Sequence, residues 1–281
     1  MPFTSLVTAN KLRQNLSDPN WRIIDCHFEL NSPDAGQNAY KKEHIPGAIY
    51  AHLDHDLAGE VIPGKTGRHP LPKIDNLVKL FSSWGIDEEV QVVVYDNRGG
   101  GIAARLWWLL KWLGHTKVAL LDGGLGGWRK SGYPLESDTP HLKSRLFHPN
   151  PNPDMIITVQ EIETFSNSKY VLVDSRAPER YRGEVEPIDN VSGHIPGAIN
   201  AHYMENLDQN QKFFSKEILE SKFLSLIGRK SSQNVVFYCG SGVTATQNIM
   251  AMYYAGLGMA KLYPGSWSEW ITDPNRPVEK S

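Results

Sequence analysis

The alternation of short apolar runs with longer amphipathic stretches predicts an α/β fold. Runs rich in Val, Ile and Leu and bounded by polar residues are typical of buried strands, and they fall at Arg22–Asp25, Val90–Tyr95, Val118–Leu121, Tyr170–Asp174 and Asn234–Tyr238. Between strands, Ala103–Leu113 places Leu residues three and four positions apart, and Gly114 follows as a stop signal. Thr244–Gly256 predicts the matching helix in the second half. Strands that alternate with helices predict a doubly wound parallel sheet flanked by helices in each half.

The same order of motifs occurs twice along the chain. Residues 43–52 read EHIPGAIYAH and residues 193–202 read GHIPGAINAH, so eight of the ten positions are identical at an offset of 150 residues. Upstream and downstream segments correspond in the same order, namely Ile23–Cys26 with Leu172–Ser175 and Gly123–Trp128 with Gly265–Trp270. A period this long indicates a duplicated domain and not a solenoid of short repeats.

A proline-rich segment separates the two copies. His141–Pro153 ends with proline at alternate positions, which disfavours a helix and favours an extended linker. We therefore predict a first domain at residues 1–140, a linker at 141–153 and a second domain at 154–281. The length of 281 residues agrees with two domains, at roughly 150 residues per domain.

Composition and charge exclude several classes of protein. Hydrophobic residues make up 40% of the chain and charged residues 21%, which is typical of a globular protein and not of a disordered one. With 29 basic and 31 acidic residues, the chain has no excess of positive charge for binding nucleic acid or anionic membranes. The apolar runs are far shorter than the ~18 residues of a membrane span. The amino terminus lacks the pattern of a secretory signal, so we expect a cytoplasmic location.

The chain contains only two cysteines, Cys26 and Cys239. Two cysteines cannot form an all-cysteine zinc site or a disulfide framework, and we predict no metal site. Cys26 lies next to Asp25 on a predicted strand, and its counterpart in the second copy is Ser175, so we expect Cys26 to be structural.

Cys239 lies where a reactive thiol is expected. It follows a predicted buried strand and precedes a loop with Gly240 and Gly242, after which a helix begins. In open parallel sheets, ligands bind at the carboxyl ends of the strands. Glycines let successive backbone N–H groups turn toward one centre, and the start of a helix adds positive potential. This environment favours a thiolate, although a buried cysteine packed as a small hydrophobic residue is the plain alternative.

A phosphatase of the cysteine-dependent type is disfavoured. Such a loop needs an arginine six positions after its cysteine to hold phosphate, and that position is Ala245 here. No arginine occurs between Gly240 and Asn248. A small loop of this kind suits a single sulfur atom better than a tetrahedral phosphate.

From about Leu6 to Pro277, the chain resembles the tandem-domain rhodanese-type sulfurtransferases. The resemblance lies in the order of a DxR motif at 174–176, the GHIPGA motif, the strand, cysteine loop and helix, and PGSWSEW at 264–270. The loop CGSGVT at 239–244 is similar to that of 3-mercaptopyruvate sulfurtransferases, whereas animal thiosulfate sulfurtransferases have basic residues directly after the cysteine. The resemblance implies an α/β fold of two tandem rhodanese-like domains, each a parallel sheet flanked by helices. The first domain is expected to be non-catalytic, because Asp96 stands where the second has Cys239.

The resemblance also implies a mechanism. Cys239 takes a sulfur atom from a small donor, 3-mercaptopyruvate by preference, and becomes a persulfide. The loop residues Gly240, Gly242, Val243 and Thr244 then hold the charge of that sulfur, and no metal or organic cofactor is needed. The sulfur passes to cyanide or to a thiol acceptor such as thioredoxin or glutathione.

Further site residues follow from matching positions in the family. Arg180 matches the substrate-binding arginine and is suited to hold a donor carboxylate. Asp54, His69 and Ser241 match a proton-relay triad. For Arg176 and Arg182 we expect salt bridges instead. The histidines of the two HIPGA motifs, His44 and His194, are expected to be structural, because the copy without the cysteine has one too.

One departure from the family leaves the donor open. A second arginine usually follows a Glu-Pro pair shortly downstream, but Glu186-Pro187 is followed here by Ile188 and Asp189. Either Arg182 takes its place, or affinity for the carboxylate is reduced and thiosulfate is the main donor. A catalytically silent rhodanese module is a further alternative, although such modules usually lack the cysteine.

Overall fold

The computed structural model describes residues 1–164, 169–228 and 230–281, and the chain divides into two compact units. The first unit consists of Met1–Gly59, Pro72–Asn152 and Leu207–Phe213. The second consists of Glu60–Leu71, Pro153–Asn206 and Phe214–Ser281. Residues 60–71 therefore pack with the second unit although they precede the linker in sequence, and this places His69 in the same unit as Cys239.

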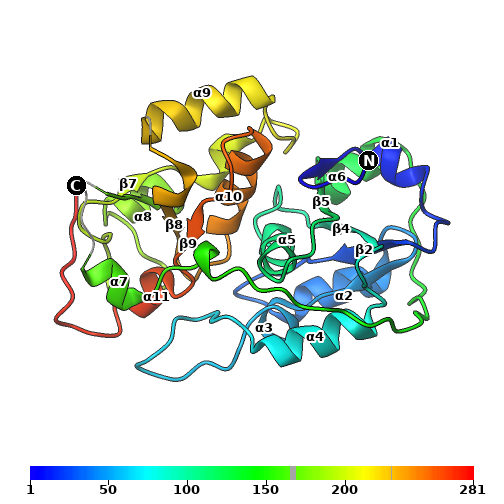
Figure 1. The fold of residues 1–281 in the computed structure, drawn as a ribbon, viewed down its shortest axis with the longest axis horizontal. Coiled ribbons are helices and arrows are strands. Elements are labelled where there is room, and N and C mark those ends of the chain that lie inside the picture. The colour runs from blue at the N-terminus through cyan, green and yellow to red at the C-terminus, as the bar shows by residue number, and fades with distance from the viewer. Residues whose placement is uncertain (165–168, 229) are drawn as a thin grey trace. The chain divides into compact units, whose positions relative to one another are not determined.

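The first unit is built on a parallel sheet with the strand order β1-β5-β4-β2-β3. Figure 1 labels β5, β4 and β2 of this sheet. Its strands are β1 (Leu6–Val7), β2 (Trp21–Asp25), β3 (Ala48–Tyr50), β4 (Gln91–Tyr95) and β5 (Val118–Leu121). Its helices are α1 (Ala9–Arg13), α2 (Asp34–Lys42), α3 (Leu53–Asp56), α4 (Ile74–Ser83), α5 (Ala103–Trp112) and α6 (Gly124–Lys130). Every residue of β4 is buried, as its unbroken apolar run predicts for a central parallel strand.

The second unit repeats this plan with the strand order β7-β6-β8-β9, again with parallel pairs. Its strands are β6 (Val171–Asp174), β7 (Ile199–Asn200), β8 (Val235–Tyr238) and β9 (Lys261–Leu262). Its helices are α7 (Val159–Glu163), α8 (Pro178–Tyr181), α9 (Lys216–Ile227), α10 (Ala245–Tyr254) and α11 (Ser266–Trp270), with short 3₁₀ turns at Pro153–Met155, Tyr203–Asn206 and Ser232–Asn234.

The structure confirms the predicted fold class and the predicted strands. Each of the five predicted strands occurs within one residue of its expected start, and helices α5 and α10 begin within one residue of theirs. The sequence pattern did not reveal β1, β3, β7 and β9, because these strands are only two or three residues long. Two of them, β3 and β7, lie inside the HIPGA repeats. His141–Asn152 contains no helix or strand, as the alternating prolines predict.

The two HIPGA histidines are structural. His44 Nδ1 donates to the carbonyl of Tyr40 at 2.7 Å, and its ring stacks on the Tyr40 ring with centroids 3.9 Å apart. His194 Nδ1 donates to the carbonyl of Tyr181 at 2.7 Å and stacks on that ring in the same way, at 3.8 Å. Each histidine also pairs through its backbone with a later segment, at Glu136 or Glu279. The duplicated histidine therefore fastens the same turn in both units.

Helix α5 is buried around nearly its whole circumference. Trp107 and Trp108 have no exposed surface. Every residue of the helix is buried except Lys111, which is partly exposed. Apart from Arg105 and Lys111 its residues are apolar, and a helix that is apolar on nearly all sides belongs in the interior of a protein. Burying each large apolar side chain contributes about 1.5–3 kcal/mol, so this helix is a main source of stability for the first unit.

The loop between β4 and α5 is folded around the carboxylate of Asp96. Asp96 Oδ1 accepts hydrogen bonds from the backbone N–H groups of Arg98 and Gly100, at 2.8 and 2.9 Å. Its Oδ2 accepts from Ile102 and Ala103, both at 2.8 Å. Asp96 is only 1% exposed. This loop geometry, at the position that corresponds to the cysteine loop of the second unit, therefore binds a negative charge.

No helix in the part of the chain that the structure describes is long and apolar enough to cross a membrane.

A buried histidine links the stability of the first unit to pH. His115 is 6% exposed, and its Nε2 donates to the carbonyl of Lys117 at 3.2 Å. Burial lowers the pKa of His115 from 6.5 to about 4. Between these values the unfolded chain binds the proton and the folded chain does not, so stability falls as the pH is lowered from about 6.5 to about 4.

We predict that His115→Gln weakens this pH dependence, because glutamine can keep the bond to Lys117 without titrating. Between pH 7 and pH 4, the free energy of unfolding of the wild-type protein should fall by about 3 kcal/mol more than that of the variant. Urea unfolding at both pH values, followed by tryptophan fluorescence, measures the difference. If the free energy of unfolding fell equally in the two proteins, the pH dependence could not be assigned to His115.

We predict that Asp96→Asn destabilises the first unit by about 2–3 kcal/mol, because an amide nitrogen would face backbone donors that the carboxylate now satisfies. Asp34→Asn, at an exposed aspartate, is the matched control and should change stability by less than about 0.5 kcal/mol. Urea midpoints compare the two. Equal midpoints for both variants would show that the loop does not depend on the anion.

Candidate functional site

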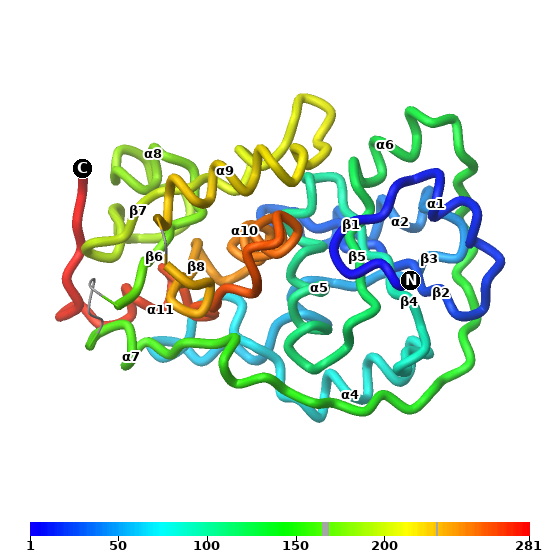
Figure 2. The backbone as a smooth tube through the Cα atoms, turned by 45° about the horizontal axis from the view of Figure 1, so that its top comes forward, coloured from blue at the N-terminus to red at the C-terminus, as the bar shows by residue number. Residues whose placement is uncertain are grey.

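Cys239 follows the last residue of β8 and precedes the loop that leads into α10. Figure 2 labels β8 and α10, the two elements that this loop connects. β8 is fully buried, and Cys239 itself is 2% exposed. The cysteine therefore lies at the carboxyl edge of the sheet, close in sequence to the start of a ten-residue helix. This is the environment in which a helix and loop amides stabilise an anion.

The cysteine loop is hydrogen-bonded to the turn at residues 264–268. The N–H of Cys239 donates to Ser266 Oγ at 3.1 Å, and the carbonyl of Cys239 accepts from the N–H of Trp267 at 3.0 Å. The N–H of Ser268 donates to the carbonyl of Gly240 at 2.9 Å. Ser266 has a φ of 56°, a left-handed conformation that costs a non-glycine residue about 1–2 kcal/mol. The turn thus holds the loop at the expense of local strain.

Two glycines of the loop have close neighbours, and Gly242 is required by its surroundings, whereas the neighbour of Gly240 is the end of a side chain. Gly242 has a φ of 74°, and a Cβ there would lie 2.2 Å from the carbonyl oxygen of Pro264. At Gly240 a Cβ would lie 2.8 Å from Nη2 of Arg68. Val243 is buried and its carbonyl accepts from Thr246, while Thr244 is the N-cap residue of α10. The predicted loop residues therefore form one tightly packed turn.

His69 and Ser241 meet beside the cysteine. His69 Nδ1 and Ser241 Oγ lie 2.7 Å apart, at hydrogen-bond distance, although 172 residues separate them in sequence. Both residues are nearly buried, with exposed fractions of 5% and 6%. The structure thus brings together two of the three residues of the predicted triad.

The third residue of the triad, Asp54, is the second residue of α3 in the first unit. Its N–H donates to Nδ1 of His52 at 3.1 Å. Its membership of the triad stays a prediction.

Arg180 is paired with carboxylates. Its Nε and Nη2 donate to Glu186 at 3.1 and 2.6 Å, and Nη2 also lies 3.3 Å from Asp189. Burial raises the pKa of Glu186, but hydrogen bonds from Arg180 and from the N–H groups of Ile188 and Asp189 more than offset this, and the pKa is lowered overall. The positive charge expected from Arg180 is therefore largely balanced in the structure.

Arg68 is a site residue that sequence reasoning did not single out. Its Nη1 forms an ion pair with Asp189, and its N–H donates to Ser268 Oγ at 3.0 Å. The close packing of Gly67 on Gly265 brings this segment onto the turn, because a Cβ at Gly67 would lie 2.4 Å from the Gly265 carbonyl oxygen. The one signal in the sequence was its position directly before His69.

The other two arginines near the DxR motif form ion pairs, as predicted. Arg176 is buried and binds Asp174 through Nε and Nη2, the latter at 2.6 Å, and Glu186 through Nη1 at 3.2 Å. Arg182 lies on the surface, with 41% of its side chain exposed, and pairs with Glu184 at 2.7 Å. This pairing favours the expected salt bridge over the alternative that Arg182 replaces the second family arginine.

Cys26 is unsuited to chemistry. It has no exposed surface, and its N–H donates to the carbonyl of Tyr95. Burial, with the nearby charge of Asp25, raises the pKa of the Cys26 thiol well above its ordinary value. It packs as part of the core, as the sequence predicted.

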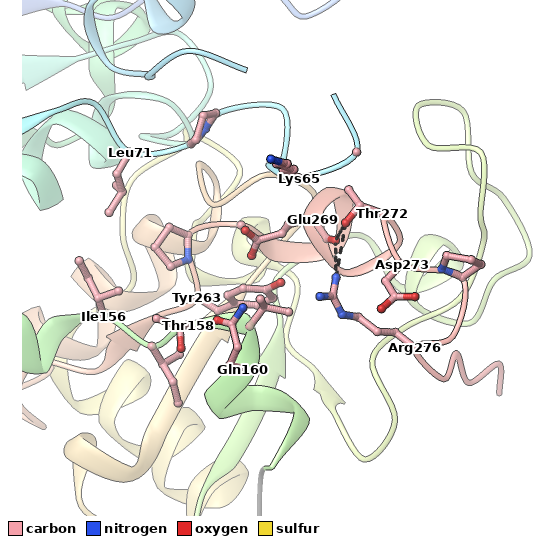
Figure 3. Close-up of a pocket in the computed structure, with 18 residues that line it drawn as sticks. Lys65, Leu71, Ile156, Thr158, Gln160, Tyr263, Glu269, Thr272, Asp273 and Arg276 are labelled. Atoms are coloured by element: carbon pink, nitrogen blue, oxygen red, sulfur yellow. Dashed lines mark hydrogen bonds between the residues drawn. The ribbon is translucent and has the colours of Figure 1, made fainter. Parts of the chain in front are cut away.

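A surface pocket of about 710 Å³ adjoins the same turn but is a different feature (Figure 3). Pro264 and Gly265 line it, together with Tyr263, Glu269 and Arg276. Burial raises the pKa of the Glu269 carboxyl. None of the predicted site residues is among the residues that line this pocket. The candidate site is therefore the cysteine loop with its neighbouring histidine and arginines.

Comparison with known proteins identifies the family to which the chain belongs. The model of the rhodanese-like domain matches residues 8–131 and again residues 158–273. The chain is 44% identical over 280 residues to "Probable 3-mercaptopyruvate sulfurtransferase" of Pseudomonas aeruginosa, covering 99% of each chain. It is 31% identical to "Thiosulfate/3-mercaptopyruvate sulfurtransferase 1, mitochondrial" of Arabidopsis thaliana, covering 98% of this chain and 78% of that one.

Among solved structures, 3-mercaptopyruvate sulfurtransferase from Leishmania major superposes with a TM-score of 0.84 at 31% identity, covering 95% of this chain and 74% of that one. Two matches to one domain model account for the internal repeat. The chain belongs to the family of two-domain, rhodanese-like sulfurtransferases.

Proposed function

We propose that the protein transfers a sulfur atom from 3-mercaptopyruvate to a thiol or cyanide acceptor through a persulfide on Cys239. The observation that supports this most directly is the arrangement around the cysteine. A buried thiol follows a strand, a serine–histidine pair lies next to it, and two guanidinium groups adjoin Gly240. A nucleophile, a proton carrier and an anion-binding group are the parts that this reaction needs.

In the first half-reaction the Cys239 thiolate attacks the sulfur of the donor. A sulfur–sulfur bond forms and the carbon–sulfur bond breaks, and its electron pair passes to carbon as the enolate of pyruvate. That enolate takes up a proton to become pyruvate. The step is redox-balanced within donor and thiol, so it needs no external oxidant or cofactor.

The cysteine loop stabilises the anionic sulfur in this proposal. Gly240, Gly242, Val243 and Thr244 form the turn, and α10 begins directly after it. The Asp96 loop of the first unit supports this assignment, because at the corresponding position four backbone N–H groups converge on one carboxylate. Preorganised donors of this kind contribute without reorganisation during the reaction.

The pair of Ser241 and His69 supplies the proton that the enolate requires. Their contact of 2.7 Å makes a short path between ring nitrogen and hydroxyl. Asp54 is proposed to orient His69, which completes the triad implied by the family resemblance. Arg180 binds the donor carboxylate, for which its guanidinium must exchange one of its present carboxylate partners.

In the second half-reaction an acceptor attacks the outer sulfur, and the Cys239 thiolate leaves. Small thiols, glutathione, thioredoxin and cyanide are all able to do so. We place the enzyme in the cytoplasm, where its two free thiols stay reduced.

Thiosulfate is the second candidate donor. Ile188 stands where the family usually has its second arginine, and this favours a lower affinity for a donor carboxylate. A Cys-dependent phosphatase remains disfavoured by Ala245. A silent binding module is disfavoured by the buried cysteine with its serine–histidine pair.

We predict that incubation with 3-mercaptopyruvate adds the mass of one sulfur atom to the protein and that Cys239→Ser abolishes the gain. Cys26→Ser is the matched control and should gain the sulfur as the wild type does, because its thiol is fully buried with a raised pKa. Intact-protein mass spectrometry measures both. A gain that survives Cys239→Ser would refute this nucleophile, and no gain with any donor would favour the silent module.

We predict that His69→Gln and Ser241→Ala lower kcat with 3-mercaptopyruvate by about 10²-fold and lower kcat with thiosulfate much less. Pyruvate enolate needs a proton, whereas sulfite leaves as a stable anion. His141→Gln, at an exposed histidine of the linker, is the control and should leave both rates unchanged. Equal losses with the two donors would argue against a proton-relay role.

A further inference from the structure

Two arginines and two carboxylates form a compact cluster beside the cysteine loop. We call Arg68, Arg180, Glu186 and Asp189 the arginine–carboxylate cluster. The two acids are the more buried members, with 3% and 6% of their side chains exposed, against 16% for Arg180 and 27% for Arg68. Arg176 also pairs with Glu186, but it brings its own carboxylate partner, Asp174, so positive and negative charges still balance. An anionic donor therefore meets free positive potential only if an arginine changes partner.

The two arginines are held differently. Arg180 binds Glu186 through two nitrogens, and Glu186 is further fixed by the N–H groups of Ile188 and Asp189. The guanidinium of Arg68 has one carboxylate partner, Asp189. The Nε of Arg68 is buried and has no hydrogen-bond partner in the structure. Among the described residues of the cluster, Arg68 is therefore the arginine with a buried donor that no protein group satisfies.

Asp189 is the weaker of the two carboxylate anchors. Burial raises the pKa of Asp189, the charge of Glu186 raises it further, and Arg68 and Arg180 only partly offset this. The pKa of Glu186, in contrast, is lowered. Keeping Asp189 ionised in this place thus costs free energy, and a second anion can compete with it.

Arg68 also lies closest to the cysteine loop. A Cβ built on Gly240 would be 2.8 Å from Nη2 of Arg68 but 3.7 Å from the nearest nitrogens of Arg180. The backbone of Arg68 is fixed by Ser268, which also holds the carbonyl of Gly240. A guanidinium this near the loop reaches the place where a donor bound at Cys239 would present its charged group.

We propose that Arg68 is the second anion-binding arginine of the donor site and that Asp189 is its resting partner, which the carboxylate or sulfur oxyanion of the donor replaces. This inference rests on the proposed function for the identity of the donor. It also accounts for Ile188, since the missing guanidinium comes from residues 60–71 and not from the segment after Glu186-Pro187. Arg68 then determines affinity, and Asp189 sets how strongly an anion must compete.

The test measures binding without sulfur transfer. In the Cys239→Ser protein, calorimetric titration with pyruvate and with inorganic sulfate gives dissociation constants for a carboxylate and a sulfur oxyanion. Arg68→Met should raise both constants about 10- to 100-fold, because a charge-assisted contact is lost. Arg68→Lys should have an intermediate effect, since it keeps the charge but not the planar fork. Arg182→Met removes an exposed arginine outside the cluster and should change neither constant.

Asp189→Asn should act in the opposite direction. It frees Arg68 and should lower both dissociation constants about three- to tenfold, a change that a merely structural role for the cluster would not produce. The inference is overturned if Arg68→Met binds both anions within twofold of the parent, if both variants weaken binding, or if neither anion binds the parent protein.

The same variants in the Cys239-containing enzyme separate this inference from the proposed function. There Arg68→Met should raise KM and change kcat by less than about threefold. Arg68-dependent anion binding in a protein that transfers no sulfur would uphold the inference and refute the function. Sulfur transfer by a protein whose anion binding does not depend on Arg68 would uphold the proposed function and refute the inference about Arg68.

Discussion

The candidate site depends on the attachment of the cysteine loop to the turn at residues 264–268. Ser266 and Trp267 hold both backbone groups of Cys239, and Ser268 holds the carbonyl of Gly240. The same turn binds the N–H of Arg68, so it also sets the position of the segment that contains His69. One strained turn thus places the proposed nucleophile, its proton carrier and a guanidinium relative to one another. The positive φ of Ser266 is the local cost of this arrangement.

Duplication supports the proposal that the cysteine loop can hold an anion. In the first unit the corresponding loop surrounds the carboxylate of Asp96, which accepts hydrogen bonds from four backbone N–H groups. In the second unit a cysteine takes that position, so the charge arises only when the thiol ionises or carries a persulfide. The first copy therefore uses the loop for stability, and in our proposal the second uses it for reaction. Both copies keep the histidine that fastens the HIPGA turn, because that role is independent of the chemistry.

Much of this could be predicted from local sequence, and the remainder depends on contacts between distant residues. The strands before Asp96 and Cys239, the glycines of the loop and the ion pairs of Arg176 and Arg182 follow from short motifs. Arg68 could not be singled out, because its importance comes from the packing of Gly67 on Gly265, nearly 200 residues away. The carboxylate partners of Arg180 were missed for the same reason, since a charge tally does not show which acids are buried beside which bases. The family resemblance led to His69 and Ser241, whose side chains lie 2.7 Å apart in the structure, and their role in proton transfer stays a prediction.

The most direct test of the account is a crystal structure of the protein after reaction with 3-mercaptopyruvate. We expect one extra sulfur atom bonded to Sγ of Cys239, with backbone N–H groups of the loop at hydrogen-bond distance from it, as four such groups surround the carboxylate of Asp96. Cys26 should remain unmodified. An unmodified Cys239 after complete turnover, or an extra sulfur that points away from the loop amides, would contradict the claim that this loop is built to hold an anionic sulfur.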